Sequence, residues 1–391
     1  MPSDLAIGIH DLSFRTTSLV LSHTELARRN GTDIAKYHKG IGQRAMSLPT
    51  ADEDIVTMAS AAAAPLVQRH GTDRVRTVVL ATESSIDQSK AAGIYVHSLL
   101  GMPPNVRVVE VKQACYGATA ALQFAAGLVH RDPQQQVLVI ASDISRYDLG
   151  SPGEATQGAA AAAMLVSAEP ALLELTGPSG LFTSDVMDFW RPNYRTTALV
   201  NGKESVAAYL EAVQGAWRDY HVRGGLPLEE FRAFCYHQPY TRLAFKAHRQ
   251  LLETCGAQAD EEALDHAVAA TTGYNETVGN SYTASMYLAL TALLDSPDDL
   301  TGRTLGLFSY GSGSVAEFFA GRVRAGYKAH LRGAAHQEAV GKRRAIGYEA
   351  YRELRERTLP TDGGWYELPH QTQGPYRLAA LRDHQRIYEA A

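Results

Sequence analysis

The stretch VRVVEVKQACYGATAALQFAAGLV, residues 106–129, contains a short run of β-branched residues, then a cysteine, then a long alanine-rich helical pattern. Similar strand-like runs flank it, VRTVVLATE at 75–83 and VLVIASD at 137–143. Short buried strands that alternate with helices indicate an α/β fold. The small-residue run GAAAAAMLVSA at 158–168 follows, and its place beside the previous strand favours a further strand over a helix.

A weaker copy of this order follows residue 170. RAFCYHQ at 232–238 has the composition of a buried strand that ends at a polar side chain, and GNSYTASMYLALTALL at 279–294 has that of a helix. RTLGLFSYGSG at 303–313 and VAEFFAGRV at 315–323 then predict two more strands. The repeated order predicts an internal duplication of one α/β unit.

The duplication divides the chain into an N-terminal half, residues 1–168, and a C-terminal half, residues 169–391. The C-terminal half ends in a charged tail from about residue 327, for which we expect a helical structure with a solvated amphipathic face. Two similar halves packed face to face bring equivalent strand ends and helix starts together at a pseudo-twofold axis. The side chains at those positions are Glu83, Cys115, His237 and Asn280.

Composition excludes several classes of protein. With 391 residues and 45% hydrophobic side chains, the chain can bury an extensive core. Three cysteines are too few for a disulfide framework and match no zinc-ligand spacing, which favours a reducing cytoplasm. The first twenty residues do not resemble a signal peptide, and no apolar run is long enough for a membrane span. A net charge of −5 with scattered signs makes nucleic acid an unexpected partner.

Cys115 is the first candidate for chemistry, because it lies between a buried strand and a helix rich in small residues. Backbone N–H groups at a helix start favour a thiolate, lower its pKa and can stabilise a thioester oxyanion. A buried structural cysteine is the alternative for any isolated cysteine, but Gly117 and Ala118 leave room for a ligand. Cys235 and Cys255 lack this context and are expected to be structural.

Glu83 and His237 each follow a predicted buried strand, so both should lie at the end of an element with little solvent. Such a carboxyl has a raised pKa suited to general acid–base chemistry, although a cap or a salt bridge would explain it as well. For His237 the alternative is a hydrogen-bonded core histidine, and for Asn280 it is a helix N-cap. Their shared positions in the two halves favour one common site.

Two further groups could contact a ligand. Ser312 lies between glycines in FSYGSGSVAEF, where a tight turn can present backbone amides, although a plain hairpin turn has the same composition. Arg242 and Lys246 are spaced i, i+4 on a predicted helix and could bind a phosphate. Charged side chains on a solvent-exposed helix face would explain the same spacing equally well.

Eight motifs in order resemble the 3-hydroxy-3-methylglutaryl-CoA synthase family, particularly the enzymes of bacterial mevalonate pathways. The resemblance runs from about residue 5 to the charged tail. The motifs are TESSID, KQACYGATAALQ, VIASDISRY, GEATQGAAAAAML, DVMDFWRP, YHQPYT, GNSYTAS and FSYGSGSVAEFF.

The resemblance implies a thiolase-like five-layered αβαβα fold, a homodimer, and a mevalonate-pathway reaction that leads to isoprenoids. In that reaction acetyl-CoA condenses with acetoacetyl-CoA, and no metal or redox cofactor is required. Cys115 matches the acylated nucleophile, Glu83 the general acid–base, and His237 the group that orients the acetoacetyl acceptor. The other matched substrate-contacting positions are Asn280, Ser312, Tyr147, Thr156, Ser205, Arg242 and Lys246.

Two departures and three rival functions remain. Ala160 stands where relatives often have glycine, and Phe245 replaces a lysine that is common in bacterial relatives. A decarboxylating ketoacyl synthase would use the same Cys, His and Asn but would not need Glu83 as a base. A synthase of polyketide β-branching performs the same chemistry on carrier-protein substrates, and the DFWRP and GEATQG segments favour the CoA enzyme over it. In a non-catalytic binding protein with a thiolase fold, the cysteine, glutamate, histidine and asparagine would have no chemical function.

Overall fold

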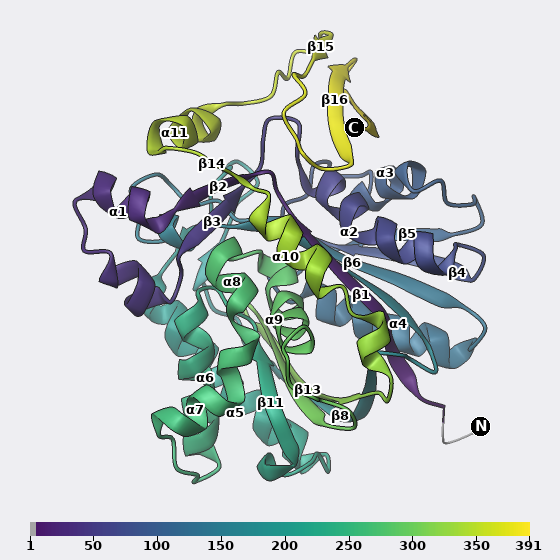
Figure 1. Ribbon diagram of the computed structural model, residues 1–391, viewed down its shortest axis with the longest axis vertical. Helices are drawn as coiled ribbons and strands as arrows, with labels where there is room; N and C mark the ends of the chain where they lie inside the picture. Colours follow the sequence, from purple (N-terminus) through teal and green to yellow (C-terminus); the bar gives the residue numbers. More distant parts are fainter. Residues whose placement is uncertain (1–4) are drawn as a thin grey trace.

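The computed structural model describes residues 5–391 and has a mixed α/β fold (Figure 1). Nine strands form one large sheet in the order β11-β12-β13-β8-β1-β7-β6-β4-β5. Their bounds are β1 Ile7–Thr16, β4 Val75–Ala81, β5 Arg107–Val111, β6 Gln136–Ile144, β7 Ala159–Ala168, β8 Leu173–Thr183, β11 Phe231–Tyr236, β12 Thr304–Gly311 and β13 Val315–Val323.

The sheet repeats one topology twice. In the N-terminal part, β4 is parallel to β6, and β6-β7-β1 continue with antiparallel pairing. In the C-terminal part, β11 is parallel to β12, and β12-β13-β8 continue in the same antiparallel way. The two parts join through a short antiparallel contact of β1 with β8, at the pairs Gly8–Glu174 and Ile9–Leu173. This is the strand order expected of a duplicated unit, while the division of the chain at residue 168 remains a proposal.

Helices cover both outer faces of the two sheet parts and fill the space between them. The bounds are α1 His23–Asn30, α2 Ile55–His70, α3 Ala92–Leu99, α4 Gly117–Arg131, α5 Gly202–Val222, α6 Thr241–Thr254, α7 Glu261–Val268, α8 Gly273–Val278, α9 Ser285–Leu294, α10 Gly333–Gly341 and α11 Tyr348–Glu356. Single helical turns are η1 Lys36–Ile41, η2 Glu154–Thr156, η3 Leu228–Glu230, η4 Ala269–Thr271, η5 Tyr282–Ala284 and η6 Tyr327–His330.

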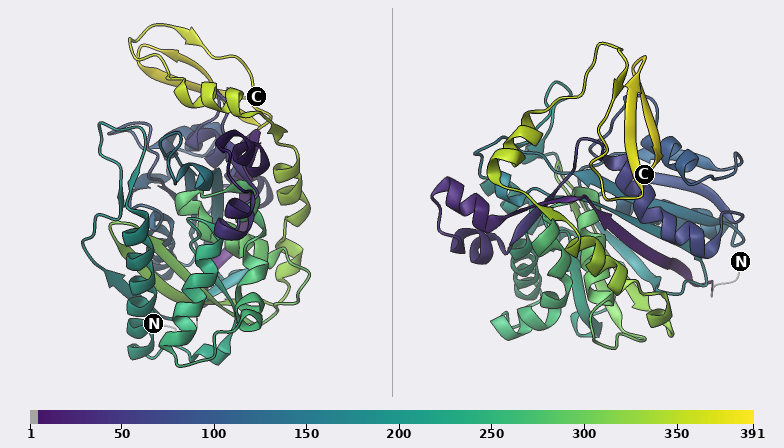
Figure 2. Two further views of the ribbon diagram at one scale, coloured as in Figure 1. Left: turned by 90° about the vertical axis from the view of Figure 1, so that its left-hand side faces the viewer. Right: turned by 45° about the horizontal axis from the view of Figure 1, so that its top comes forward.

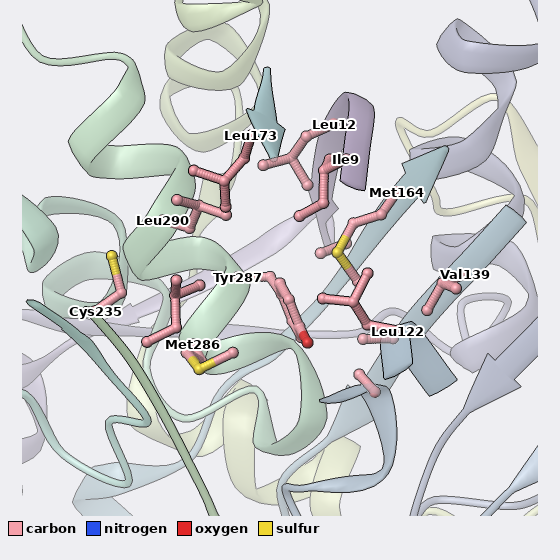
Figure 3. Packing of buried hydrophobic residues seen from close by; sticks show 14 of the residues in the cluster. Ile9, Leu12, Leu122, Val139, Met164, Leu173, Cys235, Met286, Tyr287 and Leu290 are labelled. Atoms are coloured by element: carbon pink, nitrogen blue, oxygen red, sulfur yellow. The ribbon is translucent and has the colours of Figure 1, made fainter. Parts of the chain in front are cut away.

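The predicted five-layered αβαβα arrangement is confirmed by the three main hydrophobic clusters. The central cluster joins α4 and α9 to the inner faces of both sheet parts, and Figure 3 shows Leu122, Met164 and Tyr287 among its side chains. A second cluster packs α2 and α3 on the outer face of the N-terminal part. A third packs α5 and α6 on the outer face of the C-terminal part. The sequence SMYLALTALL of α9 has no polar face because the helix is surrounded by protein.

The remaining short strands lie outside the large sheet. β14, Arg344–Ala345, pairs with β2, Leu19–Ser22, which also pairs with β3, Ala45–Leu48. β9, Phe189–Trp190, pairs with β10, Leu199–Val200. No helix formed by residues 5–391 is long and apolar enough to cross a membrane.

The prediction of a helical tail from about residue 327 is wrong for its last part. Helices continue through α11, but β15 Tyr366–Glu367, β16 Tyr376–Arg382 and β17 Gln385–Ala390 then form a small antiparallel sheet at one end of the molecule (Figure 2). Strand β16 has a short continuous apolar run, Leu378–Leu381, that is buried, which suits a short strand as well as a helix by periodicity alone. The expected amphipathic helix with a solvated face is confirmed by α11, where Tyr348 and Tyr351 are buried and most charged side chains are exposed, and Arg343 before it bonds Ser47 and the carbonyl of Thr277.

The central layer should dominate stability. Leu122 on α4 is fully buried, so Leu122→Ala should lower the free energy of unfolding by about 2–5 kcal/mol through lost burial and a residual cavity. Phe124→Ala is the matched control on the same helix, because its ring is 60% exposed. Guanidinium unfolding followed by circular dichroism measures both, and equal destabilisation by the two variants would contradict the central position of α4.

Candidate active site

Glu83 and Cys115 meet at the carboxyl ends of strands β4 and β5 of the large sheet. The parallel strands β4 and β5 end at Ala81 and Val111, and each residue lies in the loop that follows its strand. One carboxylate oxygen of Glu83, Oε1, lies 3.4 Å from Cys115 Sγ and 3.2 Å from the Cys115 backbone nitrogen. The carboxyl group therefore contacts both the thiol and the amide of the predicted nucleophile.

Cys115 precedes the helix rather than beginning it. Helix α4 begins at Gly117, and Cys115 has a left-handed backbone with φ of 54°. Gly311 lies directly against this turn, since a Cβ placed on it would stand 1.8 Å from the carbonyl oxygen of Ala114. Glycine is required there because the backbone of the β12 end approaches the cysteine loop closely.

The expected lowering of the cysteine pKa is not what the structure shows. Burial raises the pKa of the Cys115 thiol well above its ordinary value, and the nearby carboxyls of Glu83 and Asp143 raise it further. Burial likewise raises the pKa of Glu83 to about 8, with Asp143 adding to the effect. The helix start does not overcome these effects, so the free site holds a neutral thiol beside a carboxyl that is mostly protonated at pH 7.

Asp143 organises the turn that carries Glu83, and the sequence analysis missed it. It lies in β6, is fully buried, and accepts hydrogen bonds from Thr82 Oγ1 at 2.8 Å and the Glu83 amide at 2.9 Å. Ser84 donates to the same oxygen through its amide and hydroxyl, and Thr283 donates to the other oxygen. An acidic residue closing a buried run, as in VLVIASD, is the signal that had been used for Glu83 and could have found Asp143.

Tyr147, Thr156 and Asn280 gather next to the cysteine. Tyr147 packs with Cys115 and Tyr282 in one small buried cluster. The amide of Asn280 donates to the carbonyl of Thr156 at 2.9 Å, and the side chain of Asn280 accepts from the Tyr282 amide at 2.9 Å. Tyr147 and Tyr282 therefore pack in the same cluster as Cys115, whereas Thr156 and Asn280 are joined to this cluster through Tyr282.

His237 lies directly after β11, as the sequence predicts. Its side chain is 1% exposed, and its Nδ1 atom is buried with no hydrogen-bond partner among residues 5–391. Burial lowers the pKa of the imidazole to about 3, so the ring is neutral. Tyr209 donates to the His237 carbonyl at 2.7 Å, and the pKa of that tyrosine is raised by burial, by neighbouring tyrosines and by Cys115. A neutral imidazole with a free nitrogen is suited to hydrogen bonding with a ligand.

Ser312 lies on the wall of a cavity of about 1460 Å³ that also reaches Glu83 and Arg191. Its carbonyl accepts from Gln113, two residues before Cys115, at 2.9 Å. The guanidinium of Arg191 donates to the main-chain carbonyl of Glu83. The cavity thus gives a ligand access to Glu83 at the carboxyl ends of the strands.

Asp188 fixes the loop that carries Ser312 and was also missed. This fully buried carboxylate accepts from the Gly313 amide at 2.9 Å and from the Tyr310 hydroxyl at 2.9 Å. Asp188 lies inside the DVMDFWRP motif, but no hydrophobic periodicity there indicates that its carboxyl is buried.

Ser205, Arg242 and Lys246 lie farther out, and no hydrogen bond among residues 5–391 joins them to Cys115 or Glu83. Arg242 and Lys246 are exposed on α6, and Arg242 donates to the carbonyl of Lys39 in η1. The guanidinium of Arg242 lies 5.1 Å from the ring centre of Phe245, the residue that replaces a lysine. Ser205 lies in the first turn of α5.

The chain matches family models at both ends. Residues 2–171 match the model for the N-terminal part of hydroxymethylglutaryl-coenzyme A synthase, and residues 249–356 match the model for its C-terminal part. The chain is also 38% identical to the hydroxymethylglutaryl-CoA synthase of Enterococcus faecalis, over 98% of this chain and 100% of that protein. The chain belongs to the hydroxymethylglutaryl-CoA synthase family. It is accordingly an acyl-CoA condensing enzyme of the transferase type.

Solved structures agree with this family assignment and with the fold. A hydroxymethylglutaryl-CoA synthase complexed with CoA superposes with a TM-score of 0.94 at 39% identity, covering 99% of this chain and 100% of that one. MvaS in complex with 3-hydroxy-3-methylglutaryl coenzyme A superposes with a TM-score of 0.90 at 35% identity, with the same coverage.

A carrier-protein enzyme of the same family is also similar. The polyketide biosynthesis 3-hydroxy-3-methylglutaryl-ACP synthase PksG of Bacillus subtilis is 31% identical, over 81% of this chain and 80% of that protein. The family therefore includes enzymes named for two different acyl carriers.

The contact between Gly311 and the cysteine loop of this family member can be tested. Gly311→Ala should push the Ala114–Tyr116 turn away and slow acetyl transfer from acetyl-CoA to the enzyme by roughly 10²-fold, because Cys115, the predicted nucleophile, loses its position. Mass spectrometry of the quenched protein measures the rate. Gly127→Ala on α4, where an added Cβ meets no atom within 4 Å, is the matched control, and equal rates for the two variants would contradict the role of Gly311.

Proposed function

We propose that this family member condenses acetyl-CoA with acetoacetyl-CoA and water to give 3-hydroxy-3-methylglutaryl-CoA and free CoA. The observation that carries the proposal is the 3.4 Å separation between Glu83 Oε1 and Cys115 Sγ. A carboxyl beside a thiol is positioned to act on the methyl group of an acetyl unit once that unit is attached to the sulfur. General base catalysis requires this kind of reach.

The first step is acetylation of Cys115. The sulfur attacks the thioester carbon of acetyl-CoA, the bond to CoA breaks, and CoA leaves as its thiol with the proton that the cysteine loses. In the free chain the Cys115 amide is bonded to Glu83 Oε1. The oxygen of the bound acetyl group would accept the hydrogen bond of this amide in place of Glu83, and the loop at Ser312 would supply a second donor. The carboxyl group of Glu83 would then be free to approach the methyl group.

The second step forms the carbon–carbon bond. Glu83 removes a methyl proton, and the enolate carbon attacks the ketone carbon of acetoacetyl-CoA. A neutral His237 hydrogen-bonds the ketone oxygen, and that oxygen takes a proton from the Glu83 carboxyl as it becomes the hydroxyl. Water then hydrolyses the thioester to Cys115, which gives the free carboxylate of the product. Burial supports these roles, because it keeps His237 neutral and raises the pKa of Glu83 to about 8, which suits a carboxyl that first accepts and then returns a proton.

The remaining residues are assigned to substrate binding. Tyr147, Thr156 and Asn280 border the cysteine and would shape the acyl pocket. Arg242, which bonds the carbonyl of Lys39 on η1, and Lys246 are exposed on α6 and suit the phosphates of CoA. Ser205 is assigned to the substrate by the family motif alone. The reaction needs no metal or redox cofactor.

We further propose a cytoplasmic homodimer in a mevalonate pathway for isoprenoid synthesis. The three cysteines are free thiols, which suits a reducing compartment. β5 forms an edge of the large sheet and Val109 on it is 39% exposed, so a second chain could cover this edge.

A synthase that takes its acetyl group from a carrier protein is the second candidate. The similarity to the B. subtilis polyketide enzyme supports it, and the site chemistry would be the same. The higher identity to the E. faecalis enzyme, 38% against 31%, over more of the chain favours the CoA-dependent function.

The base function of Glu83 separates this reaction from decarboxylative condensation. Glu83→Ala should still acquire an acetyl group on Cys115 but should lose condensation by roughly 10²–10⁴-fold, because an acetyl methyl is a weak carbon acid. Intact-protein mass spectrometry with peptide mapping follows the acetyl group, and deuterium washout from trideuteroacetyl-enzyme follows enolate formation. The exposed Glu229→Ala variant is the surface control.

Two results would reject the proposal. One is condensation by Glu83→Ala at a rate close to that of the native chain. The other is turnover of malonyl thioesters in preference to acetyl-CoA with acetoacetyl-CoA, since decarboxylation generates the carbanion without a base.

The pH dependence of washout follows from the raised pKa of Glu83. The carboxylate is the base, and with a pKa of about 8 its fraction increases with pH up to that value. Washout of deuterium from acetyl-enzyme should therefore rise about tenfold per pH unit well below pH 8 and level off above it. A rate that stays constant between roughly pH 6 and 8 would show that Glu83 ionises at its ordinary pKa or is not the base.

A further inference from the structure

Three histidines from distant parts of the chain meet on the surface away from the active site. His10 is in β1, His70 is the last residue of α2, and His330 ends η6. One ring nitrogen of each lies within 4.8 Å of a ring nitrogen of the other two. The ring centres of His10 and His70 are 5.0 Å apart, and those of His10 and His330 are 5.6 Å apart.

The histidine cluster lies near the start of β6, at the opposite end of that strand from the catalytic residues. His10 and His70 line a cleft of about 580 Å³ together with Gln136, the first residue of β6. Asp143, near the end of the same strand, holds the Glu83 turn. At about 3.3 Å per residue, a strand of this length separates the two sites by roughly 20 Å. The histidines therefore serve no step of the condensation.

Two of the rings present a buried nitrogen without a partner. His10 Nδ1 and His330 Nδ1 are both inaccessible to solvent and have no hydrogen-bond partner among residues 5–391. A buried polar atom without a partner is costly, commonly about 1–3 kcal/mol, so a pair of them in one cluster points to a missing ligand.

The third ring is held by a carboxylate. His70 Nε2 lies 2.7 Å from Asp11 Oδ2, and Asp11 is fully buried. A carboxylate in this position fixes the orientation and tautomer of a histidine and is the usual outer partner of a metal-bound imidazole. The positive charges nearby are already engaged, because Arg332 makes two bonds of 2.8 Å to Asp11 and Arg69 makes one of 3.3 Å.

Two of the three rings, His10 and His330, are also kept in the form that binds metals. Burial lowers the pKa of His10, and the neighbouring rings of His70 and His330 lower it further. Burial is likewise the main cause of the lowered pKa of His330. Neutral imidazoles carry the lone pair that a metal ion needs, whereas protonated ones do not.

We propose that His10, His70 and His330 bind one divalent transition-metal ion, Zn²⁺ or a similar ion, with water from the adjoining cleft as the fourth ligand. Three imidazole nitrogens select Zn²⁺, Co²⁺, Ni²⁺ or Cu²⁺ over Mg²⁺ and Ca²⁺, which take oxygen ligands. Ligand nitrogens on a tetrahedral Zn²⁺ are about 3.4 Å apart, at bond lengths of about 2.0–2.1 Å. Small rotations of the three histidine side chains would bring their ring nitrogens from within 4.8 Å to this separation.

The site joins β1, α2 and the segment before α10, so a bound ion links the beginning of the chain to its C-terminal part. The ion is expected to act on stability, since a ligand that binds the folded state alone raises the melting temperature. The condensation itself is expected to require no metal, and an ion at the histidine cluster does not change that expectation.

The experiment uses the full chain without a histidine tag, treated with a chelator and then with iodoacetamide so that accessible thiols cannot bind metal. Titration with Co²⁺ should give one tetrahedral visible absorption per chain, and Zn²⁺ should displace it and raise the melting temperature. His10→Gln and His330→Gln should each weaken Co²⁺ binding by at least tenfold. The exposed His130→Gln is the matched control and should bind as the native chain does.

Binding of Co²⁺ by His10→Gln and His330→Gln with native affinity would overturn the proposal, as would the absence of any bound ion in the native chain at millimolar Zn²⁺. X-ray absorption of the Co²⁺-loaded native chain decides the case if a variant does not fold. A first shell with three imidazoles supports the site, and a shell of sulfur or of oxygen alone rejects it.

Discussion

The carboxylate of Asp143 is the contact on which the reactive centre depends. It lies near the end of β6 with no exposure to solvent, and it accepts hydrogen bonds from Thr82, Glu83 and Ser84 on one oxygen. Its other oxygen accepts from Thr283, which belongs to the C-terminal half of the chain. A carboxylate out of water is tolerated when donors surround it, so all of these groups must be in place together. The turn that carries Glu83 is thereby fixed relative to the start of α9.

The same exclusion of water sets the protonation of the groups around it. Burial raises the pKa of Cys115 and of Glu83 and lowers that of His237, so each is close to neutral before substrate arrives. Charges that develop during reaction then form in a site where electrostatic interactions are strong. The orphaned nitrogen of His237 and the amide of Cys115, at present bonded to Glu83, are the groups that a bound acyl chain would use.

Sequence reasoning succeeded where the end of a predicted strand located a functional side chain. Glu83 and His237 each follow a run of buried β-branched or aromatic residues, and the structure places both at the ends of buried strands. The expectation of a lowered thiol pKa failed for a physical reason, because the helix-start argument ignored the burial of Cys115 and the carboxyl groups of Glu83 and Asp143 that fold next to it. Asp188 and Tyr282 lie inside the DVMDFWRP and GNSYTAS motifs, but their contacts could not be predicted, since the partners are far away in the sequence. The roles carried over to Ser205, Arg242 and Lys246 come from motif positions and remain proposals.

The sequence by itself determined the main strands and helices around the site, the repeated unit and the family, because these depend on local hydrophobic periodicity and on motifs read along the chain. Only the tertiary structure decided which polar groups share a site. The small sheet formed by the last residues, the contact of Gly311 with the cysteine loop and the cluster of His10, His70 and His330 all join segments separated by many residues. Periodicity records which face of an element is buried, but it does not record what that face is buried against.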